Sequence, residues 1–399
     1  MAVAVCGLVR PLLISSLTVL CPVSSVPALA GQAPATPSPS FEEVAARAAR
    51  ARESGAAEEA IRWYRRGVHL RPQWDEGWWY LATGLYEGDR YAEAATAFGR
   101  FLAVKPQPGP ARALRGLCLF QTKEYKAALR DLGRWMAEGS LGNAEVQQAA
   151  WYHLAVLRIR EGQFELALEP MTQLCRSGAE SPRVVRAAGL MLLRLPALPS
   201  EVPREKEELL DLAGRAGYSW IALEVDEARA RFKALLERFP EAPNAHYCYG
   251  LFLLSQGSDD AALAEFGEEM KVQPRSVYPR LQTAFELLKR GDYAEARPHA
   301  EEAVRLAPGL FAAHNALGRI LVELDEVPRG VSELEEAARL APESPEMFFA
   351  LAHAYGRAGR TVDAEKARQT FQRLDAARRA AKAGGAADEP SPPSPVARQ

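Results

Sequence analysis

A sequence pattern that returns every 34 residues constrains this chain more than any other feature. Segments that begin at residues 41, 75 and 109, and again at 243, 277, 311 and 345, place small, apolar and proline residues at matching positions. In the segment 75–108 these positions hold Trp78, Leu81, Ala82, Leu85, Ala94, Phe98 and Pro106. A regular period of this length is typical of a stacked array of repeats, in place of the two or three globular domains that 399 residues would otherwise suggest.

Each unit reads as two short amphipathic helices joined by a tight turn. Gly or Asp falls at the expected chain reversal, and a late proline ends the second helix. A small side chain recurs where two helices must touch, at Ala94, Ala128, Ala167, Ala262 and Ala296. One helical hairpin cannot bury its apolar face alone, so stability must come from stacking neighbouring units. The pattern therefore predicts an all-α solenoid.

The pattern resembles the tetratricopeptide repeat (TPR) family. The family signature W-x2-L-G-x2-Y, A-x3-F, P is matched in the second unit except at Ala82 and Leu85, and the resemblance covers residues 41–378. It implies a right-handed superhelical α-solenoid of about eight to nine helix-turn-helix repeats. Repeats of this family are interaction scaffolds in many pathways, so the resemblance names no particular ligand.

The regularity breaks most strongly in the segment 196–203. Three prolines fall there, and proline is not tolerated inside a helix. One interpretation is an N-terminal array, 41–195, and a C-terminal array, 204–378, joined by a proline-rich hinge. An equally supported alternative is one continuous superhelix with a surface insertion. Residues 31–40 are expected to form a Pro/Ala/Ser linker, and residues 379–399 a disordered tail.

The first thirty residues have the features of a signal peptide. Arg10 precedes an apolar run from Leu12 to Val26, and the run ends in an A-x-A pattern at Ala28-Leu29-Ala30. Cleavage after Ala30 would send the mature chain to the periplasm or outside the cell, with no membrane span left. The alternative is an uncleaved membrane anchor.

Composition and motif searches argue against several classes of function. The 49 Lys+Arg nearly balance 51 Asp+Glu, so no strong positive field would attract nucleic acid. Histidines and cysteines do not occur at metal-ligand spacings, and no nucleophile-elbow, zinc-protease, P-loop or dinucleotide motif is present. His246 and His314 occupy the slot of Trp78, which favours a packing role. We therefore expect no enzyme activity, no metal and no cofactor.

The resemblance also implies a binding surface, because the first helix of each unit lines a concave groove in this family. The second, fifth, ninth and twelfth positions would face it, and the candidate groove residues are Trp79, Tyr86, Phe120, Tyr152, Tyr247, Leu251, Tyr278, Leu281, Phe285, Asn315, Arg319, Phe349 and His353. Such an apolar and aromatic face typically binds an amphipathic helix or an extended peptide, with Tyr247, Tyr278 and Phe285 as the expected anchors. The alternative is a groove filled by the chain itself.

One binding mode of the family is not expected here. Members that grip the C-terminal carboxylate of heat-shock chaperones pair Lys at the fifth position with Asn at the ninth, and no unit of this chain does so. The sequence thus favours a non-enzymatic scaffold of the cell envelope or periplasm that binds another protein. The alternatives are an assembly factor for envelope polymers that acts by self-association, and a regulatory subunit of a separate enzyme.

Overall fold

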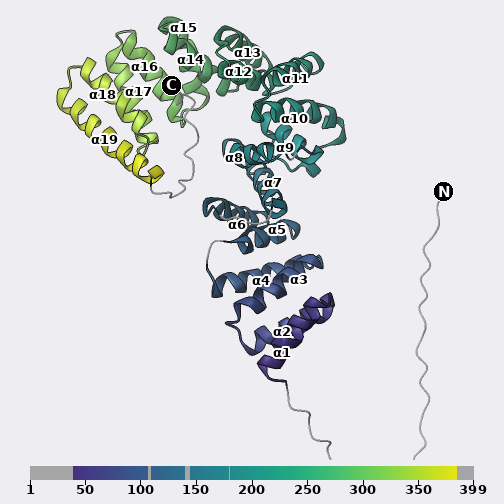
Figure 1. The fold of residues 1–399 in the computed structure, drawn as a ribbon. Coiled ribbons are helices and arrows are strands. Elements are labelled where there is room, and N and C mark those ends of the chain that lie inside the picture. The colour runs from purple at the N-terminus through teal and green to yellow at the C-terminus, as the bar shows by residue number, and fades with distance from the viewer. Residues whose placement is uncertain (1–38, 107–108, 140–143, 179, 384–399) are drawn as a thin grey trace, which may run out of the picture.

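The computed structural model describes residues 39–106, 109–139, 144–178 and 180–383. Within these ranges the chain forms nineteen α-helices, two short 3-10 turns and no strand (Figure 1). The predicted all-α solenoid is confirmed. The expected signal peptide and nearly all of the linker after it lie outside the described residues.

The helices are arranged as nine hairpins and one single helix. The hairpins are α1 (Phe41–Glu53) with α2 (Ala57–Leu70), α3 (Asp75–Glu87) with α4 (Tyr91–Val104), α5 (Pro110–Gln121) with α6 (Tyr125–Ala137), α7 (Ala144–Arg160) with α8 (Phe164–Arg176), α10 (Glu207–Ile221) with α11 (Val225–Arg238), α12 (Ala245–Ser255) with α13 (Asp259–Val272), α14 (Tyr278–Arg290) with α15 (Tyr293–Leu306), α16 (Phe311–Glu323) with α17 (Val327–Leu340), and α18 (Pro345–Arg357) with α19 (Thr361–Ala383). The single helix is α9 (Pro182–Leu192).

The same turn ends the first helix of every unit. One or two residues past the helix, one residue adopts a left-handed backbone conformation; these residues are Gly55, Asp89, Lys123, Gly162, Arg194, Leu223, Gly257, Gly291, Asp325 and Gly359. The next backbone N–H then returns to a carbonyl five residues earlier, as in the bond from Arg90 to Leu85 at 2.9 Å. The turn after α9 makes the equivalent bond, from Leu195 to Leu190, at 2.9 Å. Helix α9 is therefore the first helix of a unit whose second helix is missing.

The proline-rich segment stands in place of that missing helix. It contains only the 3-10 turns η1 (Pro199–Glu201) and η2 (Arg204–Lys206), so α9 packs directly on α10. Two glycines make the contact close: a Cβ added at Gly189 would lie 2.4 Å from the carbonyl oxygen of Leu210, and one at Gly214 would lie 2.2 Å from that of Val185. The two backbones therefore touch with no side chain between them.

The buried core continues across the proline-rich segment. Leu198 from the segment is buried in the same apolar cluster as side chains of α7, α8, α9 and α10. Leu192 and Leu193, at the end of α9, belong to the cluster that continues through α10 to α13. Bending at residues 196–203 stays a prediction, but any such motion would have to open this core.

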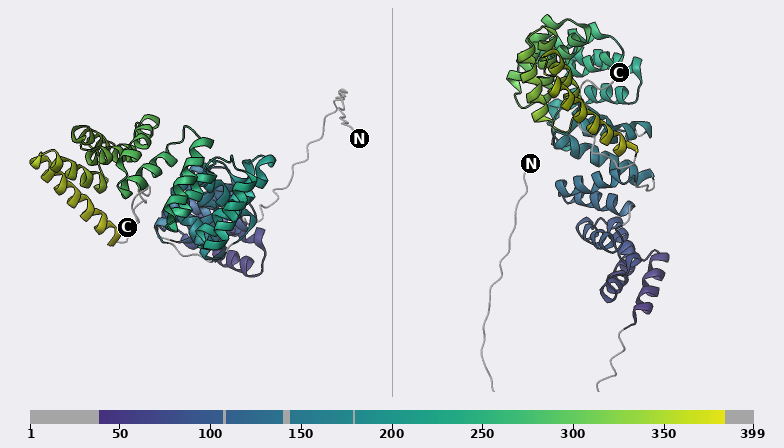
Figure 2. Two further views of the ribbon diagram at one scale, coloured as in Figure 1. Left: turned by 90° about the horizontal axis from the view of Figure 1, so that it is seen from above. Right: turned by 90° about the vertical axis from the view of Figure 1, so that its left-hand side faces the viewer.

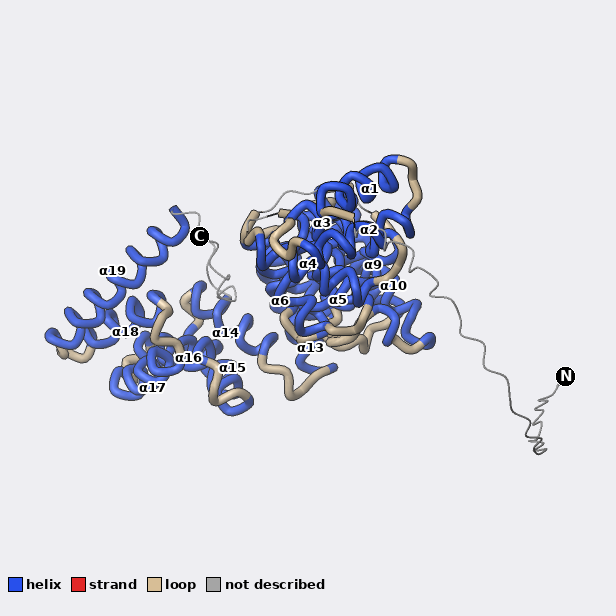
Figure 3. The backbone as a smooth tube through the Cα atoms, turned by 90° about the horizontal axis from the view of Figure 1, so that it is seen from below, coloured by secondary structure: helices blue, strands red, loops and turns tan. Residues whose placement is uncertain are grey.

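Figure 1 shows the units rising as a stack from α1 to α13, with α14–α19 turning to one side. Figures 2 and 3 show this second group lying beside the stack, with α19 at its far edge. Helix α19 continues to Ala383, so residues 379–383, expected in the disordered tail, are helical. In the described part of the chain, none of the helices combines the length and the apolar character that crossing a bilayer requires.

Candidate functional site

A recurring hydrogen bond fixes the first helix of three units against the end of the unit before. The indole Nε1–H of Trp78 donates to the carbonyl of Pro72 at 2.8 Å. The Nε2 atoms of His246 and His314 each lie 2.9 Å from the carbonyl oxygen of the proline six residues earlier. Three side chains in one slot thus make the same contact, and the two histidines have a structural role.

His246 also meets a carboxylate, because its Nδ1 lies 2.6 Å from an oxygen of Glu265. Burial lowers the pKa of His246, but the hydrogen bonds to Glu265 and to the carbonyl of Pro240 outweigh it and raise the pKa above 6.5. Both ring nitrogens face acceptors, which favours the doubly protonated imidazolium. Protonation of this histidine as the pH falls therefore strengthens its bonds both to α13 of its own unit and to the end of the unit before.

In the N-terminal half, the predicted groove residues Trp79, Tyr86, Phe120 and Tyr152 are half-buried. They pack against aromatic rings: Trp79 lies 5.4 Å from Phe101, and Phe120 lies 4.4 Å from the ring of His153. The predicted residues thus lie at a partly open surface, with much of their area already used for packing.

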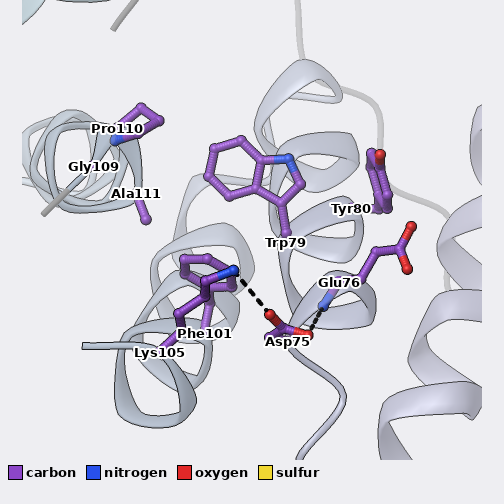
Figure 4. Close-up of a pocket in the computed structure, with 9 residues that line it drawn as sticks. All are labelled: Asp75, Glu76, Trp79, Tyr80, Phe101, Lys105, Gly109, Pro110 and Ala111. Carbon is purple, nitrogen blue, oxygen red and sulfur yellow. Dashed lines mark hydrogen bonds and ion pairs between the residues drawn. The ribbon is translucent and has the colours of Figure 1, made fainter. Parts of the chain in front are cut away.

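A small hollow beside Trp79 has a volume of about 350 Å³ (Figure 4). Its walls are Asp75, Glu76, Trp79, Tyr80, Phe101, Lys105, Gly109, Pro110 and Ala111. Asp75 accepts from the backbone N–H of Glu76 at 2.8 Å and from Lys105 at 3.2 Å, and these bonds lower its pKa. Two of its three charged groups, Asp75 and Lys105, are thus already paired, and Trp79, Tyr80 and Phe101 form its aromatic wall.

The middle of the predicted groove is filled by the chain itself. Tyr247, Leu281 and Phe285 are only 6%, 2% and 5% exposed, so the two aromatic residues cannot act as accessible anchors. The expectation that Tyr247 and Phe285 are anchors for a partner, which came from their positions in the repeat, is therefore wrong. Leu251 is half-buried, and Tyr278 keeps one exposed face.

Arg194, from the turn after α9, occupies this part of the groove. Its guanidinium lies 4.6 Å from the ring centre of Tyr278 and 4.8 Å from that of Phe164, and it pairs with Glu165 at 2.8 Å. One side chain therefore joins α8, the end of α9 and α14. Arg194 occupies a turn position, which the rule for groove-facing helix positions does not include.

The C-terminal end differs, because four predicted groove residues meet around one cavity there. Asn315 and Arg319 come from α16, and Phe349 and His353 from α18. The cavity has a volume of about 610 Å³ and is also lined by Leu288, Tyr293, Val322, Glu323, Leu334, Glu346, Ala350, Phe371, Asp375, Arg378 and Arg379. We call it the C-terminal groove.

Sequence reasoning missed the contribution of α19 to this groove. Phe371, Asp375 and Arg378 are four and three residues apart, a spacing that places them on one helix face. That spacing was the available signal, but the candidate groove residues came only from the first helix of each unit. The ring of Phe371 lies 5.5 Å from that of Phe349, which is 65% exposed.

Most charges of the C-terminal groove are neutralised within it. Arg378 pairs with Glu346 and, at 3.1 Å, with Asp375, and Arg379 reaches Asp375 at 2.5 Å. Arg319 is different: in the described ranges it forms no ion pair with a carboxylate, and burial lowers the pKa of its guanidinium more than the attraction of nearby Glu323 raises it. The side-chain oxygen of Asn315, a residue 7% exposed, also has no hydrogen-bond partner. The groove therefore holds one unpaired cation and one unpaired acceptor.

The described residues offer little for catalysis. They contain no group of three or more His, Cys, Asp or Glu side chains placed to hold a metal ion. Cys118, Cys175 and Cys248 are free and buried, and burial raises the pKa of each thiol to about 12, far from that of a reactive thiolate.

Comparison with known proteins agrees with the repeat pattern. A family model described as "Tetratricopeptide repeat" matches residues 81–139, 222–275 and 281–345. The TPR repeat-containing protein PA4299 of Pseudomonas aeruginosa is 35% identical over 115 residues, which cover 28% of this chain. The match spans 46% of that relative, so this chain corresponds to less than half of its length.

Solved structures of low sequence identity were also found. MamA from Desulfovibrio magneticus RS-1 is 21% identical, with a TM-score of 0.39, and the match covers 43% of this chain and 96% of that one. YrrB, described as a TPR protein with an unusual peptide-binding site, is 17% identical, with a TM-score of 0.36, over 40% of this chain and 82% of its own.

Proposed function

Because this chain belongs to the tetratricopeptide repeat family, a family of protein-interaction scaffolds, we propose that it is a non-enzymatic scaffold that binds a segment of another protein in its C-terminal groove. The proposed site is the space between α16, α18 and α19. The proposed partner is an exported protein, since residues 1–30 have the pattern of a signal peptide.

One observation supports the C-terminal groove as the binding site. The C-terminal groove combines an exposed aromatic ring, Phe349, with two inner polar groups that lack partners, Asn315 and Arg319. Its volume of about 610 Å³ falls in the range of ligand-binding clefts. The middle of the array lacks this combination, because Arg194 already fills it.

The proposed binding mode is recognition of a peptide or an amphipathic helix on a preformed surface. The groove walls are helices packed into the array, so little ordering is required when the partner binds. Phe349 and Phe371 would provide the apolar contact, and Arg319, Asn315 and His353 the directional one. The nearly balanced overall charge supports a protein partner over nucleic acid.

A pair of matched variants tests this proposal. Phe349 is 65% exposed inside the groove, and Val362 is 67% exposed outside it. Tagged full-length chain, Phe349→Ala and Val362→Ala are each expressed in the source cells, checked by circular dichroism, and purified with their bound proteins.

We expect one exported protein to be retained by the parent and by Val362→Ala and to be lost with Phe349→Ala. The same proteins on all three chains would contradict the groove as the site. Recovery of the chain alone would favour self-association and an assembly role instead.

A further inference from the structure

Two neighbouring side chains on α16 indicate what the C-terminal groove recognises. Asn315 and Arg319 are four residues apart, so they lie on one face of the helix, and both line the groove. The oxygen of Asn315 has no partner although the residue is only 7% exposed. A buried acceptor left without a donor is costly, and native structures leave few of them.

Asn315 and Arg319 require different hydrogen-bond partners. The oxygen of Asn315 requires an N–H donor, and the guanidinium of Arg319 carries five donors and a full charge. A carboxylate satisfies a guanidinium best, through two parallel hydrogen bonds. A ligand that offers an N–H and a carboxylate within one residue would satisfy both.

The other charges of the groove do not compete for this role. Arg378 and Arg379 are held by Glu346 and Asp375, on α18 and α19. Glu323, one turn beyond Arg319 on α16, attracts the Arg319 guanidinium but forms no ion pair with it, and it also lies 3.8 Å from Arg357. Arg319 is therefore the cation left for an incoming acid, among the groove residues that the structure describes.

The apolar side of the groove adds a second requirement. Phe349 is largely exposed although its ring is tilted against that of Phe371, and Leu288 and Val322 also line the space. Burying the exposed face of Phe349 would favour an aromatic or large aliphatic side chain next to the acid.

We propose that the C-terminal groove selects an extended partner segment in which Asp or Glu lies next to an aromatic or large aliphatic residue. The carboxylate pairs with Arg319, the backbone N–H of the segment donates to Asn315, and the apolar side chain covers Phe349. This inference rests on the proposed scaffold function and specifies its ligand.

The chain's own C-terminus is the competing occupant. Asp388 and Glu389 lie only five and six residues beyond the end of α19, but the residues that follow, through Gln399, include no aromatic side chain. The tail can thus supply an acid without an aromatic side chain to cover Phe349, which favours a partner segment.

Selection from a library of random twelve-residue peptides tests the proposal. The bait is the immobilised full-length chain, beside Arg319→Gln, Arg319→Glu and Arg373→Glu, where Arg373 is an exposed cation outside the groove. We expect the parent and Arg373→Glu to enrich an acidic residue next to an aromatic or aliphatic one. Arg319→Gln should lose the acidic preference, and Arg319→Glu should favour a basic residue.

A synthetic copy of the enriched peptide is then titrated by fluorescence anisotropy. Loss of a charge-assisted hydrogen-bonded pair predicts about ten- to hundredfold weaker binding to Arg319→Gln. Arg373→Glu should change the affinity less than about threefold, as expected for a screened surface charge.

Three results would overturn the inference. Peptides that need Phe349 but show no acidic preference would leave the scaffold function standing and refute the acid requirement. Peptides that bind only after Asp388→Asn and Glu389→Gln would make the tail the occupant. Failure of every bait to select a peptide that depends on Phe349 or Arg319 would refute the scaffold function at this groove as well.

Discussion

Gly214→Ala should destabilise the chain, although the same substitution normally strengthens a helix. The new Cβ would lie 2.2 Å from the carbonyl oxygen of Val185 and 2.9 Å from that residue's Cγ1. Ordinary contacts begin near 3.4 Å, so α9 and α10 would have to move apart by about 1 Å. Such overpacking costs about 1–3 kcal/mol. The higher helix propensity of alanine raises the free energy of unfolding by only about 0.5–1 kcal/mol.

Gly133→Ala is the matched control. Gly133 is also inside a helix, α6, but an added Cβ would have no neighbour within 4 Å. Only the propensity gain remains, so this variant should be more stable than the parent by about 0.5–1 kcal/mol. The propensity gain is common to both variants, so they should differ by the overpacking cost of about 1–3 kcal/mol in the free energy of unfolding.

Urea denaturation followed by far-ultraviolet circular dichroism measures this difference. A double variant with Gly189→Ala sharpens it, because once one alanine has separated the helices the second should cost less than it does alone. Equal stabilisation by Gly214→Ala and Gly133→Ala would refute the close contact. The proline-rich segment would then be a free linker between two arrays.

Other predictions concern single side chains. The pKa of His246 is raised in the folded chain, so its stabilising effect is fully present below pH 6.5 and is lost as the pH rises through the folded-state pKa. Thermal melts from pH 5.5 to 8.5 should therefore show a steeper loss of stability for the parent than for His246→Phe, and parallel profiles would contradict this. The thiols of Cys118, Cys175 and Cys248, with pKa values raised to about 12, should resist iodoacetamide at pH 8 in the native chain and react in urea, as mass spectrometry would show. Arg194→Ala should lower the free energy of unfolding by about 1–3 kcal/mol, because it removes an ion pair and two cation–π contacts; an unchanged urea midpoint would show that Arg194 does not join α8 to α14.

The fold could be predicted because its information is local and repeated. Turn residues, small contact residues and late prolines return at a fixed interval, so each unit supports the assignment of the next. The incomplete unit was harder to recognise. Helix α9 ends in the usual turn, but the turn residue is Arg194, where most other units have Gly or Asp.

The groove was less predictable, because exposure depends on contacts between units. Tyr247 and Phe349 both occupy predicted groove positions, yet the first is buried and the second is 65% exposed. Tyr247 packs against Phe266 and Tyr278, and Arg194, which comes from an earlier unit, lies over the ring of Tyr278. A rule based on position within one repeat cannot predict a contact with a residue of another unit, such as that between Arg194 and Tyr278.

The central claim is that a partner occupies the C-terminal groove, and site-specific photo-crosslinking tests it most directly. The photoreactive residue p-benzoylphenylalanine is placed at Phe349 or, as a control of equal exposure, at Val362, and the source cells are irradiated. The account predicts a crosslink to one exported protein from position 349, absent from position 362 and lost when Arg319→Gln is added. A crosslink of equal strength from both positions, or one from position 362 alone, would contradict it.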